Sequence, residues 1–185
     1  MGTENNAIYP LPQLLVTEYI HELQKKYKNV QDNLINIGLL IFNFAKRPGF
    51  AMVSQLCRHN GLEFYSLDEV CTFLSMTFSK TLFDVECKYK ITRKSMNQEV
   101  VFSFPTLPPW FESIKIEKGM QVSQEQKFMY IAYTHFFEGL YAGALMHFGY
   151  KVVPTISKDP VIPLELNYIS VEEMEGSWKF SVSSQ

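Results

Sequence analysis

The four histidines and the acidic side chains of this sequence do not have the spacing of a complete catalytic or metal site. The histidines are His21, His59, His135 and His147. His135 and Glu138 are three residues apart, which places both on one face of a helix, as in some helical metal sites. One such pair supplies too few ligands for a structural metal, and His135 lies within an apolar stripe. We therefore expect a core histidine and no bound metal.

Cys57 is the best candidate for a reactive side chain because Arg58 and His59 follow it directly. A neighbouring cation lowers the pKa of a thiol and favours the nucleophilic thiolate. An ordinary free cysteine is the simpler interpretation, and core packing is expected for Cys71 and Cys87. The sequence has no glycine-rich phosphate loop, no G-x-S-x-G and no H-E-x-x-H. We expect no catalytic residues, no enzyme activity and no cofactor.

Composition and charge are typical of one soluble domain in a reducing compartment. The 185 residues are 46% hydrophobic and 15% aromatic, which suits a single domain with a large core. The 17 basic and 19 acidic residues give no basic excess, so we expect no nucleic-acid partner. Three cysteines without a CxxC pair favour the cytoplasm. No stretch is apolar over the roughly 20 residues that a membrane helix needs, and no signal peptide is evident.

Two helices with extensive apolar surface are expected near the start of the chain. Apolar residues recur every four positions from Leu11 to Tyr27, which predicts an amphipathic helix. A second helix is expected over residues 30–46, apolar nearly all round and ended by Pro48 and Gly49. A helix of this kind is covered on more than one side, so we predict a partner interface on these helices. The residues assigned to it are Leu15, Tyr19, Leu23, Leu34, Ile37, Ile41 and Phe42.

The following segment changes from a helical to a strand pattern. Residues 50–65 have no clear periodicity. Ser66 and Glu69 match the capping box that starts a helix. Alternating polar and apolar residues then predict strands at 85–91 and 99–104, joined by a polar hairpin.

A long fourth helix is expected from another capping box at residues 123–126 to a glycine C-cap at Gly149. Gly139 and Gly143 lie four residues apart on one face of it. Each glycine weakens a helix by about 1 kcal/mol relative to alanine. We therefore expect the backbone of another element to lie close to both glycines.

The expected fold class is α+β: three N-terminal helices, a β-hairpin, a long helix and two C-terminal strands. The last two strands are expected at residues 151–157 and 164–169, giving a four-stranded antiparallel sheet packed on helices. We divide the chain into an N-terminal tail of residues 1–12, a single domain of residues 13–170 and a C-terminal tail of residues 171–185.

Residues 139–149 carry a distinctive pattern of small residues, G-L-Y-A-G-A-L-M-H-F-G. This stretch resembles the G-L-x-R-G-A-L-x-x-x-G element of the small subunits of the transport protein particle, TRAPP, with Ala142 in place of the family's arginine. Residues 33–41 are similar to the L-x-x-x-G-x-x-I/V-G pattern of the family's second helix. The resemblance covers residues 14–170 and is nearest to the longer, helix-rich subunits of the subunit-six type.

The resemblance implies a non-catalytic core subunit of a complex that tethers vesicles and activates a Rab GTPase in ER–Golgi traffic. Such subunits are α+β domains that form heterodimers through their first two helices, within a larger assembly peripheral to Golgi and ER membranes. The exchange surface sits on other subunits, so contact with the Rab is indirect. One family member carries an acylated cysteine just before its third helix, and Cys57 lies near that place.

Two other functions remain open at this stage. A related microbial domain, of vinyl-reductase-like proteins, shares this fold and binds small hydrophobic ligands. A pocket lined by Phe73, Phe78, Phe128 and Phe136 would suit that function, although such aromatics also pack plain cores. An enzyme of unfamiliar type would use Cys57 as its nucleophile.

Overall fold

The computed structural model describes residues 10–26, 30–94, 97–106, 111, 123–154 and 164–173. Most of both expected tails, the hairpin tip at 95–96 and the end of the strand expected at 151–157 lie outside these ranges. The helices are α1 (Pro10–Lys26), α2 (Val30–Asn60), α3 (Leu67–Phe73), the π-helix η1 (Leu74–Phe78), α4 (Ser79–Phe83) and α5 (Gln124–His147). The strands are β1 (Lys88–Lys94), β2 (Asn97–Phe104), β3 (Tyr150–Pro154) and β4 (Leu164–Glu173).

The four strands form one antiparallel sheet in the order β1-β2-β4-β3. The buried residues of β2 alternate along the strand, as expected for a sheet with one covered face. Phe102 pairs with Leu166 and Val100 with Tyr168, and all four side chains are buried. The predicted α+β class and its four-stranded sheet are confirmed.

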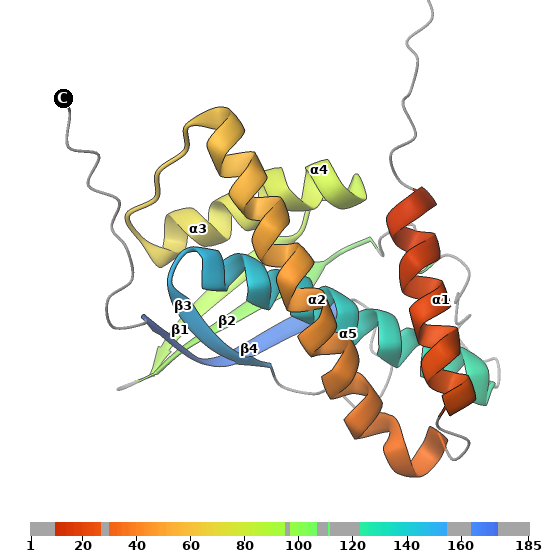
Figure 1. Cartoon of the computed structure of the whole chain (residues 1–185). Coiled ribbons are helices and arrows are strands. Elements are labelled where there is room, and N and C mark those ends of the chain that lie inside the picture. Colours follow the sequence, from red (N-terminus) through yellow and green to blue (C-terminus); the bar gives the residue numbers. More distant parts are fainter. Residues whose placement is uncertain are drawn as a thin grey trace, which may run out of the picture.

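Helix α5 is the centre of the molecule, with the sheet on one side and α2 on the other (Figure 1). Every residue from 130 to 145 is buried. Tyr141 packs on Phe102 at a ring-centroid distance of 4.8 Å, so this side of α5 faces the sheet. Its start and end follow the sequence: the Ser123 and Gln126 capping box is formed, and Gly149 has the positive φ of a C-cap glycine, 83°.

The predicted end of the second helix at Pro48 and Gly49 is wrong, because α2 continues to Asn60. Proline lacks the N–H that an internal helical residue donates, which costs a helix about 3 kcal/mol. Packing offsets this cost. A Cβ on Gly49 would lie 2.7 Å from the carbonyl carbon of Leu140, so the glycine lets α2 rest directly on the backbone of α5. Gly61, with φ of 58°, follows the last helical residue.

The third predicted helix consists of three segments that follow one another directly: α3, the π-helix η1 and α4. At its start the Ser66 hydroxyl accepts from the Glu69 N–H, as predicted, while the Glu69 carboxylate accepts from the Tyr65 N–H at 2.7 Å. The first strand begins three residues later than predicted. Its preceding residue, Cys87, donates its N–H to the Ser75 carbonyl of η1 at 3.1 Å instead of pairing with β2.

Candidate functional site

The crossing of α2 and α5 decides which residues of α2 are exposed. A Cβ on Gly139 would lie 2.6 Å from Ala45 Cβ, and one on Gly143 would lie 2.9 Å from the Phe50 nitrogen. These distances are too short for real side chains, so the two backbones meet at both glycines. The predicted close approach at this pair is confirmed. The opposite side of α2 is left facing outward.

The residues predicted to form the partner interface lie mostly in this chain's own core. Leu23, Ile37, Ile41 and Phe42 are buried, and Tyr19 is half-buried. Leu15 lies on α1 and Leu34 on α2, outside the side chains that the structure describes. The sequence did not separate inward from outward positions because α2 is apolar nearly all round, so its pattern carries no clear phase.

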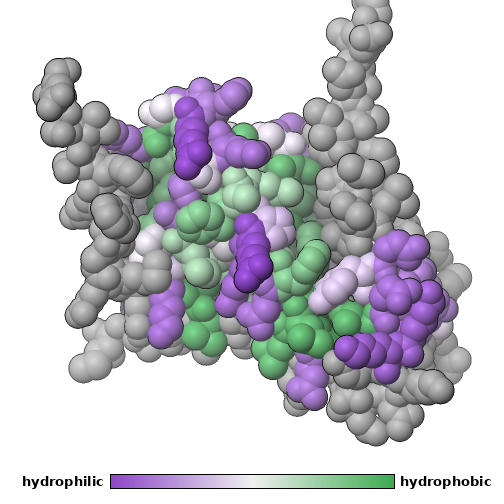
Figure 2. Space-filling view, viewed as in Figure 1, coloured by the Kyte–Doolittle hydropathy of each residue, from purple (hydrophilic) through white to green (hydrophobic). Residues whose placement is uncertain are grey.

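The outward side chains of α2 from Asn36 onward are apolar, cationic or, as at Asn43 and Gln55, polar and uncharged. We call the surface that they form the α2 outer face. Its apolar members are 41 to 44% exposed, and they are Leu39, Leu40, Phe44 and Phe50. Arg47 and Arg58 are exposed on the same helix, which has no acidic residue after Asp32. Figure 2 shows this mixed surface along α2, with apolar patches separated by hydrophilic side chains.

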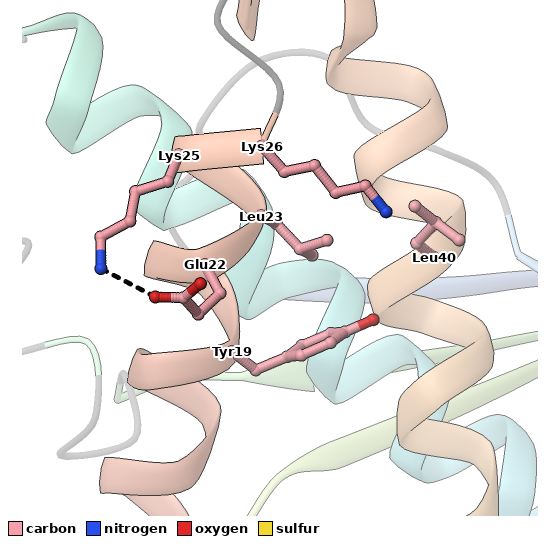
Figure 3. A pocket seen from close by; sticks show the side chains of 6 residues that line it. All are labelled: Tyr19, Glu22, Leu23, Lys25, Lys26 and Leu40. Atoms are coloured by element: carbon pink, nitrogen blue, oxygen red, sulfur yellow. Dashed lines mark hydrogen bonds and ion pairs between the residues drawn. The ribbon is translucent and has the colours of Figure 1, made fainter.

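A hollow of about 650 Å³ lies between α1 and the start of the α2 outer face. Its lining residues are Tyr19, Glu22, Leu23, Lys25, Lys26 and Leu40. Tyr19, Leu23 and Lys26 point toward α2, with Lys26 reaching toward Leu40 (Figure 3). Tyr19 also stacks on Phe44 at a centroid distance of 4.4 Å. The hollow therefore has an apolar wall and a charged rim that carries two lysines and one glutamate.

Glu22 and Lys25 form an ion pair at the outer rim of the hollow. The Lys25 Nζ lies 2.7 Å from Glu22 Oε1, and both side chains are largely exposed. The hydrogen bond between them lowers the pKa of Glu22 and raises that of Lys25. Exposed pairs of this kind contribute little stability, so the pair mainly neutralises the acidic charge of α1 at this rim.

His135 is a core residue, as predicted, and is paired with Glu138. The His135 Nδ1 lies 2.7 Å from Glu138 Oε2, and both side chains are at most 3% exposed. Burial raises the pKa of Glu138, while the hydrogen bond to His135 opposes that rise. Glu138 Oε1 has no hydrogen-bond partner among the described residues. No group of three potential metal ligands occurs in the described part of the chain.

The three cysteines are free thiols in buried positions. Cys57 is 8% exposed near the end of α2, and burial raises the pKa of its thiol, against the reactive thiolate considered above. Burial raises the pKa of Cys71 to about 12. Cys87 lies 3.3 Å from the Ser79 hydroxyl, which also contacts Tyr141 OH. Nothing in the sequence indicates this polar cluster, because Ser79 lies on α4, Cys87 just before β1 and Tyr141 on α5.

The four phenylalanines proposed for a ligand pocket are all buried. Phe73 packs against Phe64, with ring centroids 5.0 Å apart. Phe78 packs against Tyr141 instead, with centroids 5.4 Å apart.

Within the described residues, no helix is long and apolar enough to cross a membrane.

Comparison with known proteins gives a fold likeness and no sequence match. No protein-family model matches the sequence, and no curated protein matches it. Among solved structures, the chain is similar to a trafficking protein particle complex subunit 3 from Naegleria fowleri, which is covalently bound to palmitic acid. The TM-score is 0.61 at 13% sequence identity, covering 89% of this chain and 95% of that chain. The chain therefore has the fold of a TRAPP subunit.

Proposed function

We propose that this chain is a non-catalytic core subunit of a TRAPP-like complex that tethers vesicles and activates a Rab GTPase in ER–Golgi traffic. The observation that carries the proposal is the fold likeness, which extends over nearly the whole of both chains. The motif of residues 139–149 supports it independently, because its two glycines make the tight helix crossing. The subunit-six type is part of this proposal and rests on the sequence resemblance alone.

An assembly role is also supported by the exposed apolar side chains of α2. Apolar patches that a monomer leaves exposed commonly mark interaction sites. The α2 outer face carries four large apolar side chains on one helix, beside the hollow next to α1. In this proposal the face pairs with another TRAPP-like subunit, the contact with the Rab is indirect, and the complex is cytoplasmic and peripheral to Golgi and ER membranes.

Native mass spectrometry of the full chain, purified at moderate salt from its own cells, tests the proposal. We expect a heteromeric assembly that contains other small α+β subunits and stimulates nucleotide exchange on a Rab GTPase. Leu40→Glu should release the chain from this assembly because it places a charge in an apolar interface. Leu62→Glu is the matched control, since Leu62 is exposed to a similar degree, 39% against 41%, in the loop after α2. A parent chain recovered only as a monomer would contradict the proposal.

Binding of a small hydrophobic molecule is a second candidate function. The covalently bound palmitic acid of the similar subunit favours it. In this chain the corresponding proposal is acylation of Cys57, which the raised pKa of that thiol opposes. The same native sample separates the two functions. A mass increment that hydroxylamine removes would support acylation, and a dissociable small molecule would support a ligand-binding domain.

A further inference from the structure

The α2 outer face has a one-sided charge that restricts its partner. Arg47 and Arg58 are the charged side chains exposed among its apolar residues, and α2 offers no acidic residue beside them. Arginine pairs well with carboxylates at interfaces, where its planar group makes two parallel hydrogen bonds. A partner with carboxylates beside its own apolar residues would match both features of this face.

A second copy of this chain does not supply that match. In a symmetric dimer the same patch contacts itself, so the arginines of one copy would face a surface that is also cationic. The acidic residues of α1, Glu18 and Glu22, are accompanied by Lys25 and Lys26 on the same helix. Glu22 is already paired with Lys25. Helix α1 therefore offers no excess of negative charge to the arginines of another copy.

The hollow favours a protein partner over a membrane surface. Its wall of Tyr19, Leu23 and Leu40 is concave, and Tyr19 is fixed by stacking on Phe44. A protruding apolar side chain fits such a hollow, as in helix-in-groove recognition. A bilayer surface does not project a side chain into it. The exposed residues of α2 follow one face of a helix, which suits a second helix laid along it.

We propose that the α2 outer face binds an amphipathic helix of a different protein that carries acidic residues beside its apolar stripe. One apolar side chain of this helix enters the hollow, and its carboxylates pair with Arg47 and Arg58. The inference rests on the proposed function for the location of the interface, and it adds the chemistry of the partner.

Two synthetic helical peptides test the inference on the full-length chain. Both carry the same leucine stripe, flanked by glutamate in one and by lysine in the other. Fluorescence anisotropy should show that the glutamate peptide binds about tenfold more tightly at low salt, with the difference reduced at high salt. Arg47→Glu should abolish or reverse this preference. Lys90→Glu makes the same charge change at an exposed position of β1 and should leave it intact.

Equal binding of both peptides, binding of neither, or a preference that survives Arg47→Glu would overturn the inference. Binding to phosphatidylserine vesicles that is lost in Arg47→Glu, without peptide selectivity, would assign the face to a membrane instead. These outcomes are separate from the test of the proposed function. If the native assembly forms but tolerates Arg47→Glu, the charge inference fails and the function stands. If the chain is a monomer in cells yet selects the glutamate peptide, the function fails.

Discussion

Replacing Gly143 by alanine adds one methyl group where α5 meets α2. The new Cβ would lie 2.8 Å from the carbonyl carbon of Lys46, closer still to its oxygen, and 2.9 Å from the nitrogen of Phe50. Real Cβ atoms do not approach other heavy atoms within 3.0 Å. Since both obstacles are backbone, no rotamer change can relieve the clash. The two helices must move apart by roughly 1 Å to restore van der Waals contact.

Two opposing terms set the size of the effect. Alanine improves helix propensity over glycine by about 1 kcal/mol. Overpacking a tight site costs about 1 to 3 kcal/mol, and the upper end applies at Gly143 because the neighbouring atoms are backbone. We expect Gly143→Ala to reduce the free energy of unfolding by about 2 kcal/mol net. Gly143→Leu should lose more. The contacts with backbone atoms therefore make Gly143→Ala a clear loss.

Denaturant unfolding followed by circular dichroism measures both variants against the parent. Ala51→Gly is the control, because Ala51 is exposed on α2 and its replacement measures the propensity term without a clash. In thermal melts a loss of this size lowers Tm by about 4 to 8 °C for a chain of this length. If Gly143→Ala is as stable as the parent, α2 and α5 do not meet at this glycine, and the crossing would need another explanation.

Two further variants and one labelling experiment test the interior. Glu138→Gln should flatten the pH dependence of stability. Because burial raises the pKa of Glu138 in the folded state, folding favours the protonated form, and the parent's free energy of unfolding should fall as pH rises above about 4.5. Denaturant melts across pH measure this, and the same pH dependence in the parent and in Glu138→Gln would contradict it. Cys57 should react slowly with thiol reagents and give an unmodified intact mass, because it is buried with a raised pKa; fast labelling would refute this. Tyr141→Phe should cost about 1 kcal/mol, because its hydroxyl contacts Ser79 in the core; an unchanged melt would show that the contact is energetically neutral.

The parts of the fold that sequence predicts well are those with a local chemical cause. The capping box at Ser123 and the C-cap glycine Gly149 mark the two ends of α5, because each provides hydrogen bonds for free backbone groups within a few residues. The alternation in β2 predicts a sheet with one covered face, and Phe102 and Phe104 are buried as it requires. Such signals do not depend on what the rest of the chain does.

The parts that sequence misses depend on contacts between distant elements. Pro48 is a helix breaker by local rules, but α2 passes through it because Gly49 rests on the backbone of α5. The first strand starts late because the Cys87 N–H donates a hydrogen bond to the carbonyl of Ser75 in η1, which lies twelve residues before Cys87. The π-helix itself has no signal in the sequence that we could identify. Each case needs the tertiary neighbour to be known first.

The candidate site shows the same dependence. The interface on the first two helices stays a prediction. Of the residues assigned to it, Ile37 and Ile41 face the core, whereas the exposed apolar side chains of α2 include Leu40 and Phe44. Once the glycines of α5 are placed against α2, the outward positions follow from helical geometry alone. Gly139 contacts the backbone at Phe42, so the residues on the other side of α2 must be exposed.

Helix α2 therefore links the core to the candidate interface. Its inner side is held on α5 by contacts between backbones, which permit little rotation of the helix because no flexible side chain lies between them. Its outer side presents Leu40, which lines the hollow, and then Phe44 and Arg47 farther along the helix. A rigid surface loses little conformational entropy on binding. The glycines that weaken α5 as an isolated helix thus hold the proposed binding face of its neighbour in one orientation.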